Sequence, residues 1–152
     1  MRPLFKAMRP KQWAKNIFVF AGLFFDGKLL NPKSFALSIA AFAVFCCVSS
    51  AIYLVNDLMD IEQDRLHPKK RFRPLASGEL EQSTARVAAI VLLVISLATS
   101  LAISPLFAVV VAIYAVIMLL YSFKLKHVVI IDVLIVAAGF VLRVWGGTVV
   151  VD

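Results

Sequence analysis

Long apolar stretches constrain the fold of this chain more than any other feature. Three of them contain no charged residue, at about 35 to 55, 87–103 and 106–123, and a fourth begins near 128. About 20 consecutive apolar residues suffice for a helix to cross a bilayer, where the backbone must satisfy its own hydrogen bonds. Since 62% of the 152 residues are hydrophobic, the sequence predicts an all-α fold, a polytopic transmembrane helical bundle in one membrane domain over residues 1–152.

The apolar run between 13 and 30 is less regular, and the charge pattern decides whether it spans the membrane. Segment 1–16, which is basic and interfacial, and segment 65–73 are the two most basic stretches, and basic loops stay in the cytoplasm. An even number of crossings must then separate them, so 13–30 is predicted to span. The expectation is about five membrane helices in the cell inner (plasma) membrane, with the N-terminus and the 62–81 loop cytoplasmic.

The net charge of +7 indicates membrane and phosphate chemistry. Basic clusters beside membrane helices attract anionic lipid, and the sequence carries no nucleic-acid-binding motif. The expected partners therefore include the lipid bilayer and exclude nucleic acid. The two cysteines, Cys46 and Cys47, are neighbours inside an apolar run, and we expect them to be packing residues.

Three aspartates follow the second apolar run directly, at Asp57, Asp60 and Asp64. Nothing between 51 and 66 interrupts a helix, so spacings of three and four residues place them on one face, with Asn56 at its edge. Three carboxylates that close repel one another unless a cation neutralises them. A set of oxygen ligands without histidine or cysteine suits Mg²⁺, so these three aspartates are the predicted metal ligands.

A basic segment follows the aspartates and contains Arg65, Lys70, Arg71 and Arg73. Arginine offers paired donors to a phosphate, and lysine offers a point charge, so this segment could hold phosphates that Mg²⁺ bridges to the carboxylates. A plainer interpretation is a solvated helix end beside a membrane-surface patch. The complete constellation at the end of an apolar helix favours the metal–phosphate site.

The pattern N-D-x-x-D-x-x-x-D, from Asn56 to Asp64, resembles the first aspartate-rich motif of the UbiA superfamily of intramembrane prenyltransferases. Its continuation D-R-x-H-P-x-K-R-x-R-P-x-A-S-G is similar to the branch that transfers phosphoribose to decaprenyl phosphate. Two further stretches agree with that branch: R-P-K-Q-W-x-K-N at Arg9–Asn16, and Y-S-F-K-L-K-H-V-V-I-I-D-V at 121–133 with G-F-V-L-R after it. The resemblance covers essentially the whole chain.

The resemblance implies Mg²⁺-dependent transfer of 5-phosphoribose from phosphoribosyl pyrophosphate to a polyprenyl (decaprenyl) phosphate, with release of diphosphate. Asp57, Asp60 and Asp64 would hold the metal and, with Asn56, form the catalytic set. The implied substrate contacts come from several segments: Lys15, Asn16, Arg65, Lys70, Arg71, Arg73, Tyr121, Lys124 and Lys126. Segment 1–16 has two interpretations: an interfacial segment, or one whose Lys15 and Asn16, with Arg9 and Gln12 as further candidates, contact a lipid phosphate at the mouth of the site. The alternatives are an aromatic prenyltransferase of the same superfamily, and a non-catalytic membrane subunit whose basic loop binds anionic lipid.

The last apolar run carries two ionisable residues, Asp132 and Arg143, on one face with Gly139 between them. Ionisable groups within a membrane helix normally face a bundle interior or a cavity. For Asp132, a structural pairing with another helix and a role in the site are equally consistent with the sequence. For Arg143, the structural role is favoured. Gly146 and Gly147 extend a small-residue face against which a neighbouring helix can pack closely.

Members of the superfamily have about nine helices and a second acidic or polar motif in their later half. The present sequence supplies five predicted helices and only the first motif. We therefore expect the N-terminal half of a UbiA-like nine-helix fold, completed either by further helices of the same protein or by a partner, with a homo-oligomer as one possibility.

Overall fold

The computed structural model describes residues 2–125 and 129–151, and these residues form helices and connecting turns without a β-strand. The helices follow one another along the chain as α1 (Arg2–Ala7), the 3-10 helix η1 (Pro10–Phe20), α2 (Ala21–Phe25), α3 (Pro32–Met59), α4 (Ile61–Leu66), the 3-10 turn η2 (Lys70–Phe72), α5 (Gln82–Ile103), α6 (Pro105–Leu120), the π-helical turn η3 (Tyr121–Leu125) and α7 (Val129–Val151).

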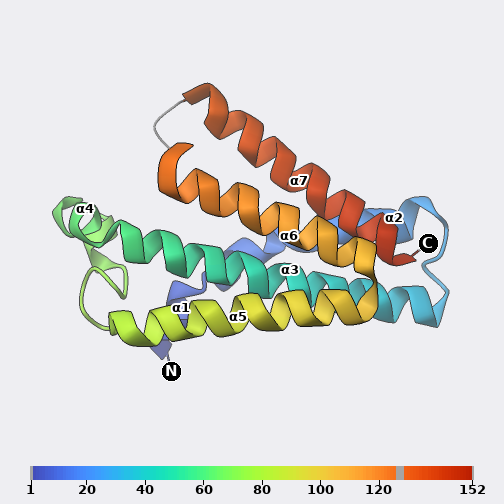
Figure 1. Ribbon diagram of the computed structural model, residues 1–152, viewed down its shortest axis with the longest axis horizontal. Helices are drawn as coiled ribbons and strands as arrows, with labels where there is room; N and C mark the ends of the chain where they lie inside the picture. The colour runs from blue at the N-terminus through green and yellow to red at the C-terminus, as the bar shows by residue number, and fades with distance from the viewer. Residues whose placement is uncertain (1, 126–128, 152) are drawn as a thin grey trace.

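Four of the described helices are long and apolar enough to cross a membrane. They cover Pro32–Met59, Gln82–Ile103, Pro105–Phe123 and Val133–Val151. Helix α3 is central, because it packs against α5, α6, α7 and η1 (Figure 1). The expected all-α membrane bundle is confirmed, and the long helices agree with the expected apolar runs.

The main core lies where α3, α6 and α7 meet. The Phe45 ring contacts the rings of Phe107 and Tyr114 edge-on, at centroid distances of 6.1 and 5.4 Å. A second buried cluster ties the segment after α4 to α3 and α5, and it comprises Ala7, Leu54, Ile61, Leu75, Leu80, Ala85 and Ala89. This second cluster fixes the basic segment against the end of the bundle, so the charges that follow the aspartates have a defined place.

The segment expected as the first membrane helix differs from a regular span. Residues 10–25 form η1 followed directly by the short α2. A 3-10 helix rises about 2.0 Å per residue against 1.5 Å in an α-helix, so this segment extends about 30 Å, the thickness of a hydrocarbon core. Figure 1 shows it running behind the long helices, from the end that carries α4 to the opposite end.

Glycines allow this segment to lie directly against α7. A Cβ atom on Gly147 would overlap the carbonyl oxygen of Val19, and a Cβ on Gly22 would come within 2.7 Å of the Thr148 backbone. The expectation that the small face of the last helix permits close packing is therefore confirmed.

The continuous helix expected from 51 to 66 is interrupted at one residue. Helix α3 ends at Met59, Asp60 has φ −96° and ψ 7°, and α4 then continues to Leu66. Helical hydrogen bonds still cross the bend, from Asp60 N–H to the Asn56 carbonyl and from Asp64 N–H to the Asp60 carbonyl, at 3.1 and 2.7 Å. The interruption is a kink, and Asp57 and Asp64 on either side of it bind the same guanidinium, that of Arg73.

Candidate active site

Two buried carboxylates and one arginine form the centre of the candidate site. Asp57 near the end of α3 and Asp64 in α4 each expose 2% of their surface. The guanidinium of Arg73 donates to both, at 3.2 Å to Asp57 and 2.7 Å to Asp64. A buried carboxylate requires a compensating cation, so Arg73 links the basic segment to the aspartate face.

Arg9 provides the second cation at Asp57, to which it donates a hydrogen bond. Its guanidinium also lies 4.8 Å above the ring of Tyr53. The backbone of Arg9 has φ 54° and ψ 61°, a left-handed conformation that costs about 1–2 kcal/mol for a residue with a Cβ atom. Such conformations persist where surrounding contacts over-determine them, as the bonds of this side chain do.

The sequence indicated Arg9 only as a further candidate contact of a lipid phosphate at the mouth of the site, and its pairing with Asp57 was not predicted. The sequence signal for it was its place at the start of the R-P-K-Q-W-x-K-N stretch. Its positive φ could not be inferred, because a residue before proline is ordinarily extended.

A cleft of about 420 Å³ opens beside the aspartate face. Its polar wall contains Asn56, Asp60, Arg9 and Lys70, and the Asn56 amide donates to an Asp60 carboxylate oxygen at 3.4 Å. The remaining lining residues come from α3, α6, η3 and α7, namely Ile52, Tyr53, Met118, Tyr121, Ser122 and Val136. The cleft thus joins a charged end to an apolar wall, the arrangement that a phosphorylated lipid requires.

The oxygen donors of the aspartate motif fit Mg²⁺ by their chemistry. Asn56 and Asp60 line the cleft, Asp57 binds its lining residue Arg9, and these three with Asp64 supply only hard oxygen ligands. Among the described residues, no three acidic, histidine or cysteine side chains converge as a preformed metal cluster. In this arrangement Asp57 and Asp64 bind arginines, so a metal would have to exchange with guanidinium groups.

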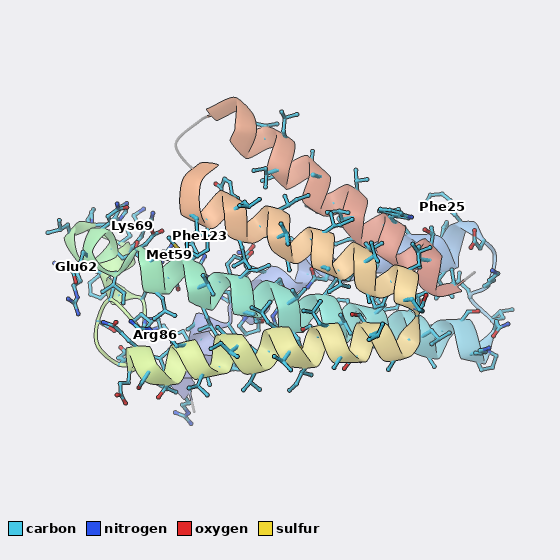
Figure 2. The ribbon with its side chains drawn as sticks, in the orientation of Figure 1. Phe25, Met59, Glu62, Lys69, Arg86 and Phe123 are labelled. Carbon is cyan, nitrogen blue, oxygen red and sulfur yellow. The ribbon has the colours of Figure 1, made fainter. Side chains whose placement is uncertain are left out.

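The basic residues after the aspartates separate into two groups. Lys70 lines the cleft, and Arg73 binds the carboxylates of Asp57 and Asp64. Arg65 instead pairs with Glu62 at 2.9 Å and donates to the Ala76 carbonyl, and Arg71 stacks on the exposed ring of Phe72. Figure 2 shows Glu62 and Lys69 at the α4 end of the molecule, opposite Phe25.

The two neighbours expected at the mouth of the site take different positions. Lys15 is exposed and lines a smaller pocket deeper in the bundle. Asn16 is fully buried and makes hydrogen bonds with Arg143, Cys46 and Ser49, so it lies in the interior and not at the mouth. The burial follows from the tight path of η1 between α3 and α7.

Tyr121 lines the aspartate cleft from η3. The side chains of Lys124, Lys126 and Asp132, which the sequence associates with the site, lie outside the described part of the chain. Arg143 is buried, as expected for an ionisable residue in a membrane helix, and it contacts both a structural partner and a pocket.

Comparison with known proteins agrees with this arrangement. The UbiA prenyltransferase family model matches residues 16–152. The decaprenyl-phosphate phosphoribosyltransferase of Mycolicibacterium smegmatis is 41% identical over 157 residues, which cover 98% of this chain and 48% of that protein. The protein of the same name from Corynebacterium glutamicum is also 41% identical, over 96% of this chain and 45% of its own length. The chain thus spans about half the length of these curated relatives.

Solved structures share the fold. The structure of a digeranylgeranylglyceryl phosphate synthase superposes with a TM-score of 0.85 at 25% identity, covering 99% of this chain and 53% of that one. A UbiA homologue from Archaeoglobus fulgidus, bound to DMAPP and Mg²⁺, gives a TM-score of 0.80 at 26% identity, over 95% of this chain and 53% of its own. The aspartate motif, the fold and the family match lead to one conclusion: this chain belongs to the UbiA prenyltransferase family.

Proposed function

We propose that the protein transfers 5-phosphoribose from phosphoribosyl pyrophosphate to a polyprenyl phosphate, such as decaprenyl phosphate, and releases diphosphate. The observation that carries this proposal is the cleft in which Asn56 and Asp60, at the end of α3, meet cationic side chains and an apolar wall. Relatives named decaprenyl-phosphate phosphoribosyltransferase, at 41% identity along nearly the whole chain, support this choice of substrates.

The charged end of the cleft suits the diphosphate of the donor. Mg²⁺ held by Asp57, Asp60 and Asp64 would neutralise diphosphate charge. Lys70 faces the same cleft and can stabilise negative charge on the departing diphosphate. Arg9 and Arg73, which bind the carboxylates in this structure, carry guanidinium groups that pair equally well with phosphate oxygens.

The apolar wall suits the acceptor. Its polyprenyl tail can remain in the bilayer while its phosphate enters the cleft past residues such as Ile52, Met118 and Val136. A phosphate oxygen of the acceptor attacks the anomeric carbon of the ribose as the bond from that carbon to the diphosphate breaks. The acceptor is itself the nucleophile, so the reaction requires no covalent intermediate with a protein side chain.

The site is proposed to face the cytoplasm, from the inner membrane. The N-terminal segment and the basic segment lie together, since Lys6 pairs with Glu79 at 3.7 Å and Arg9 binds Asp57. Basic residues concentrated at one end of a bundle favour the cytoplasmic side for that end.

Prenyl transfer to an aromatic acceptor is the second candidate function. The observation in its favour is the likeness to the Archaeoglobus fulgidus structure, which contains DMAPP and Mg²⁺. Both reactions begin with departure of a diphosphate, so the aspartate face is compatible with either. The alternatives differ in the donor, which an experiment can therefore identify.

The test supplies the purified full-length gene product with radiolabelled phosphoribosyl pyrophosphate or radiolabelled prenyl diphosphate. Each donor is offered with decaprenyl phosphate and with an aromatic acid. The expected result is Mg²⁺-dependent transfer of label from phosphoribosyl pyrophosphate to decaprenyl phosphate. Transfer only from prenyl diphosphate to the aromatic acid would overturn the proposal in favour of the second candidate.

Substitutions of the aspartates test whether this activity depends on them. Asp57→Asn and Asp60→Asn are expected to lower the transfer rate about 100-fold or more, as loss of a charged group at a leaving group does. Glu62→Gln is the matched control, because the Glu62 side chain is 82% exposed and pairs only with Arg65 in the described part of the chain.

A further inference from the structure

Arg143 is a buried cation for which the described residues provide no carboxylate. It exposes 7% of its surface, and its three nitrogens donate to the Asn16 side chain, the Gly139 carbonyl and the Tyr114 hydroxyl at 2.7–2.8 Å. A guanidinium has five N–H donors, so two remain without an acceptor among the described groups. A charge inside a membrane bundle is costly without a counter-ion, which makes this site favourable for an anion.

A pocket of about 110 Å³ lies beside this guanidinium, several times the ~15 Å³ that one water molecule needs. Its lining consists of Lys15, Ser49, Ile52, Tyr53, Tyr114, Met118, Val136, Phe140 and Arg143. We call it the Arg143 pocket. It contains two cationic side chains and three hydroxyl groups, while its other walls are apolar.

The Arg143 pocket adjoins the cleft beside the aspartates. The two share Ile52, Tyr53, Met118 and Val136 as lining residues. On α3, residue 49 lines the deeper pocket and residue 56 lines the cleft, and seven residues of helix correspond to about 10 Å. A molecule that binds its diphosphate at the aspartates can therefore extend toward the deeper cations.

We infer that the Arg143 pocket is a subsite for a phosphomonoester, separate from the diphosphate site at the aspartates. Arginine remains charged in any protein environment, and its planar group of donors matches phosphate oxygens. Lys15 has no ion pair within the described residues and adds a second positive charge at the same pocket. The hydroxyls of Ser49 and Tyr53 offer further donors.

This inference rests on the proposed function, which supplies two sources of a phosphomonoester. Phosphoribosyl pyrophosphate carries a diphosphate at C1 and a phosphomonoester at C5, on opposite sides of the ribose. A polyprenyl phosphate carries its phosphomonoester at the head of the lipid. A prenyl diphosphate carries none, so this subsite distinguishes the proposed substrates from those of the second candidate function.

Binding of monophosphates in the absence of metal tests the subsite directly. The full-length gene product in detergent, with EDTA present, is titrated in a calorimeter with ribose 5-phosphate, farnesyl phosphate and ribose. We expect one of the two monophosphates to bind and ribose not to bind. Binding of ribose 5-phosphate identifies the donor as the source, and binding of farnesyl phosphate identifies the acceptor.

Three variants make the result specific. Lys15→Gln and Arg143→Lys are expected to weaken the binding monophosphate about tenfold or more, the effect of losing one charge-assisted hydrogen bond. Lys11→Gln removes an exposed charge from the same segment outside the pocket and is expected to change nothing. If Arg143→Lys does not fold, Lys15→Gln decides, because no contact among the described residues makes the Lys15 side chain necessary for folding.

The inference is overturned if neither monophosphate binds the wild-type protein, or if Lys15→Gln binds it as well as the wild type does. Such a failure is distinguishable from a failure of the proposed function, which is measured by label transfer in the presence of Mg²⁺. A protein that binds a monophosphate in EDTA but uses a prenyl diphosphate as donor would retain the subsite and lose the phosphoribosyl assignment.

Discussion

At the scale of single residues, Arg73 has the most direct effect on the aspartate face, since it neutralises two carboxylates that are almost fully buried. Removing one partner of a buried ion pair leaves an uncompensated charge, so Arg73→Gln is expected to lower the free energy of unfolding by about 3 kcal/mol. If Asp57 and Asp64 bind Mg²⁺, the metal replaces the missing cation. Mg²⁺ should then raise the unfolding temperature of Arg73→Gln more than that of the wild type.

Thermal unfolding in detergent, with Mg²⁺ and with EDTA, measures both effects. Arg71→Gln is the control, because Arg71 is exposed and stacks on Phe72 without contacting an aspartate in the described structure. Equal destabilisation of the two variants, or the same response of both to Mg²⁺, would contradict the assignment of these aspartates as metal ligands.

At the scale of elements, the crossing of η1 with α7 depends on Gly147. A Cβ there would overlap the Val19 carbonyl oxygen, and because the obstacle is backbone, neither side can rotate away. Gly147→Ala is expected to cost at least about 3 kcal/mol of folding free energy, the upper range for overpacking. The fraction of folded protein after detergent extraction and its unfolding temperature measure this cost. Ala137→Leu, at an exposed position of the same helix, should have little effect.

The contact between η1 and α7 also separates the helices that the sequence predicted from the one that it could not predict. The four long helices follow from apolar runs, a local property of the sequence. The 3-10 form of residues 10–20 has no such signal, because the contact with Gly147, more than 100 residues later, cannot be inferred from local periodicity.

The candidate site likewise has a part that the sequence predicted and a part that it could not predict. Helical spacing predicted Asp57, Asp60 and Asp64 on one face. The structure brings Asp57 and Asp64 to one guanidinium, that of Arg73, whereas Asp60 lines the cleft. The partners of these aspartates could not be predicted, because Arg9 is 48 residues from Asp57 along the chain and adopts a left-handed backbone. The role of Asn16 as a buried partner of Arg143 likewise depends on contacts between segments that are distant in sequence.

At the scale of the whole molecule, the fold brings the two most basic segments of the sequence to the same end of the bundle. The basic N-terminal segment and the basic segment after the aspartates meet at one end, held by the Lys6–Glu79 and Arg9–Asp57 pairs. The opposite end carries the turn between α2 and α3 and the turn at Ser104 (Figure 1). With the proposed substrates and the proposed orientation, the charged end of the cleft would receive the soluble donor from the cytoplasm, and its apolar wall would receive the lipid acceptor from the membrane.

This arrangement requires that residues 10–25 cross the bilayer although they do not form a regular membrane helix. Their extent of about 30 Å is sufficient, because the 3-10 rise compensates for the small number of residues.

We therefore predict that Lys11 and Ser77 lie on the cytoplasmic side and that Leu30, which is 96% exposed, lies on the other. Single cysteines at these positions, in a background with Cys46→Ala and Cys47→Ala, are treated on intact cells with a membrane-impermeant maleimide. Only Leu30→Cys should react before permeabilisation, and all three should react after it. Reaction of Lys11→Cys and Leu30→Cys from the same side would show that the segment does not cross. Reaction of Lys11→Cys and Ser77→Cys, but not of Leu30→Cys, in intact cells would show that the site has the opposite orientation.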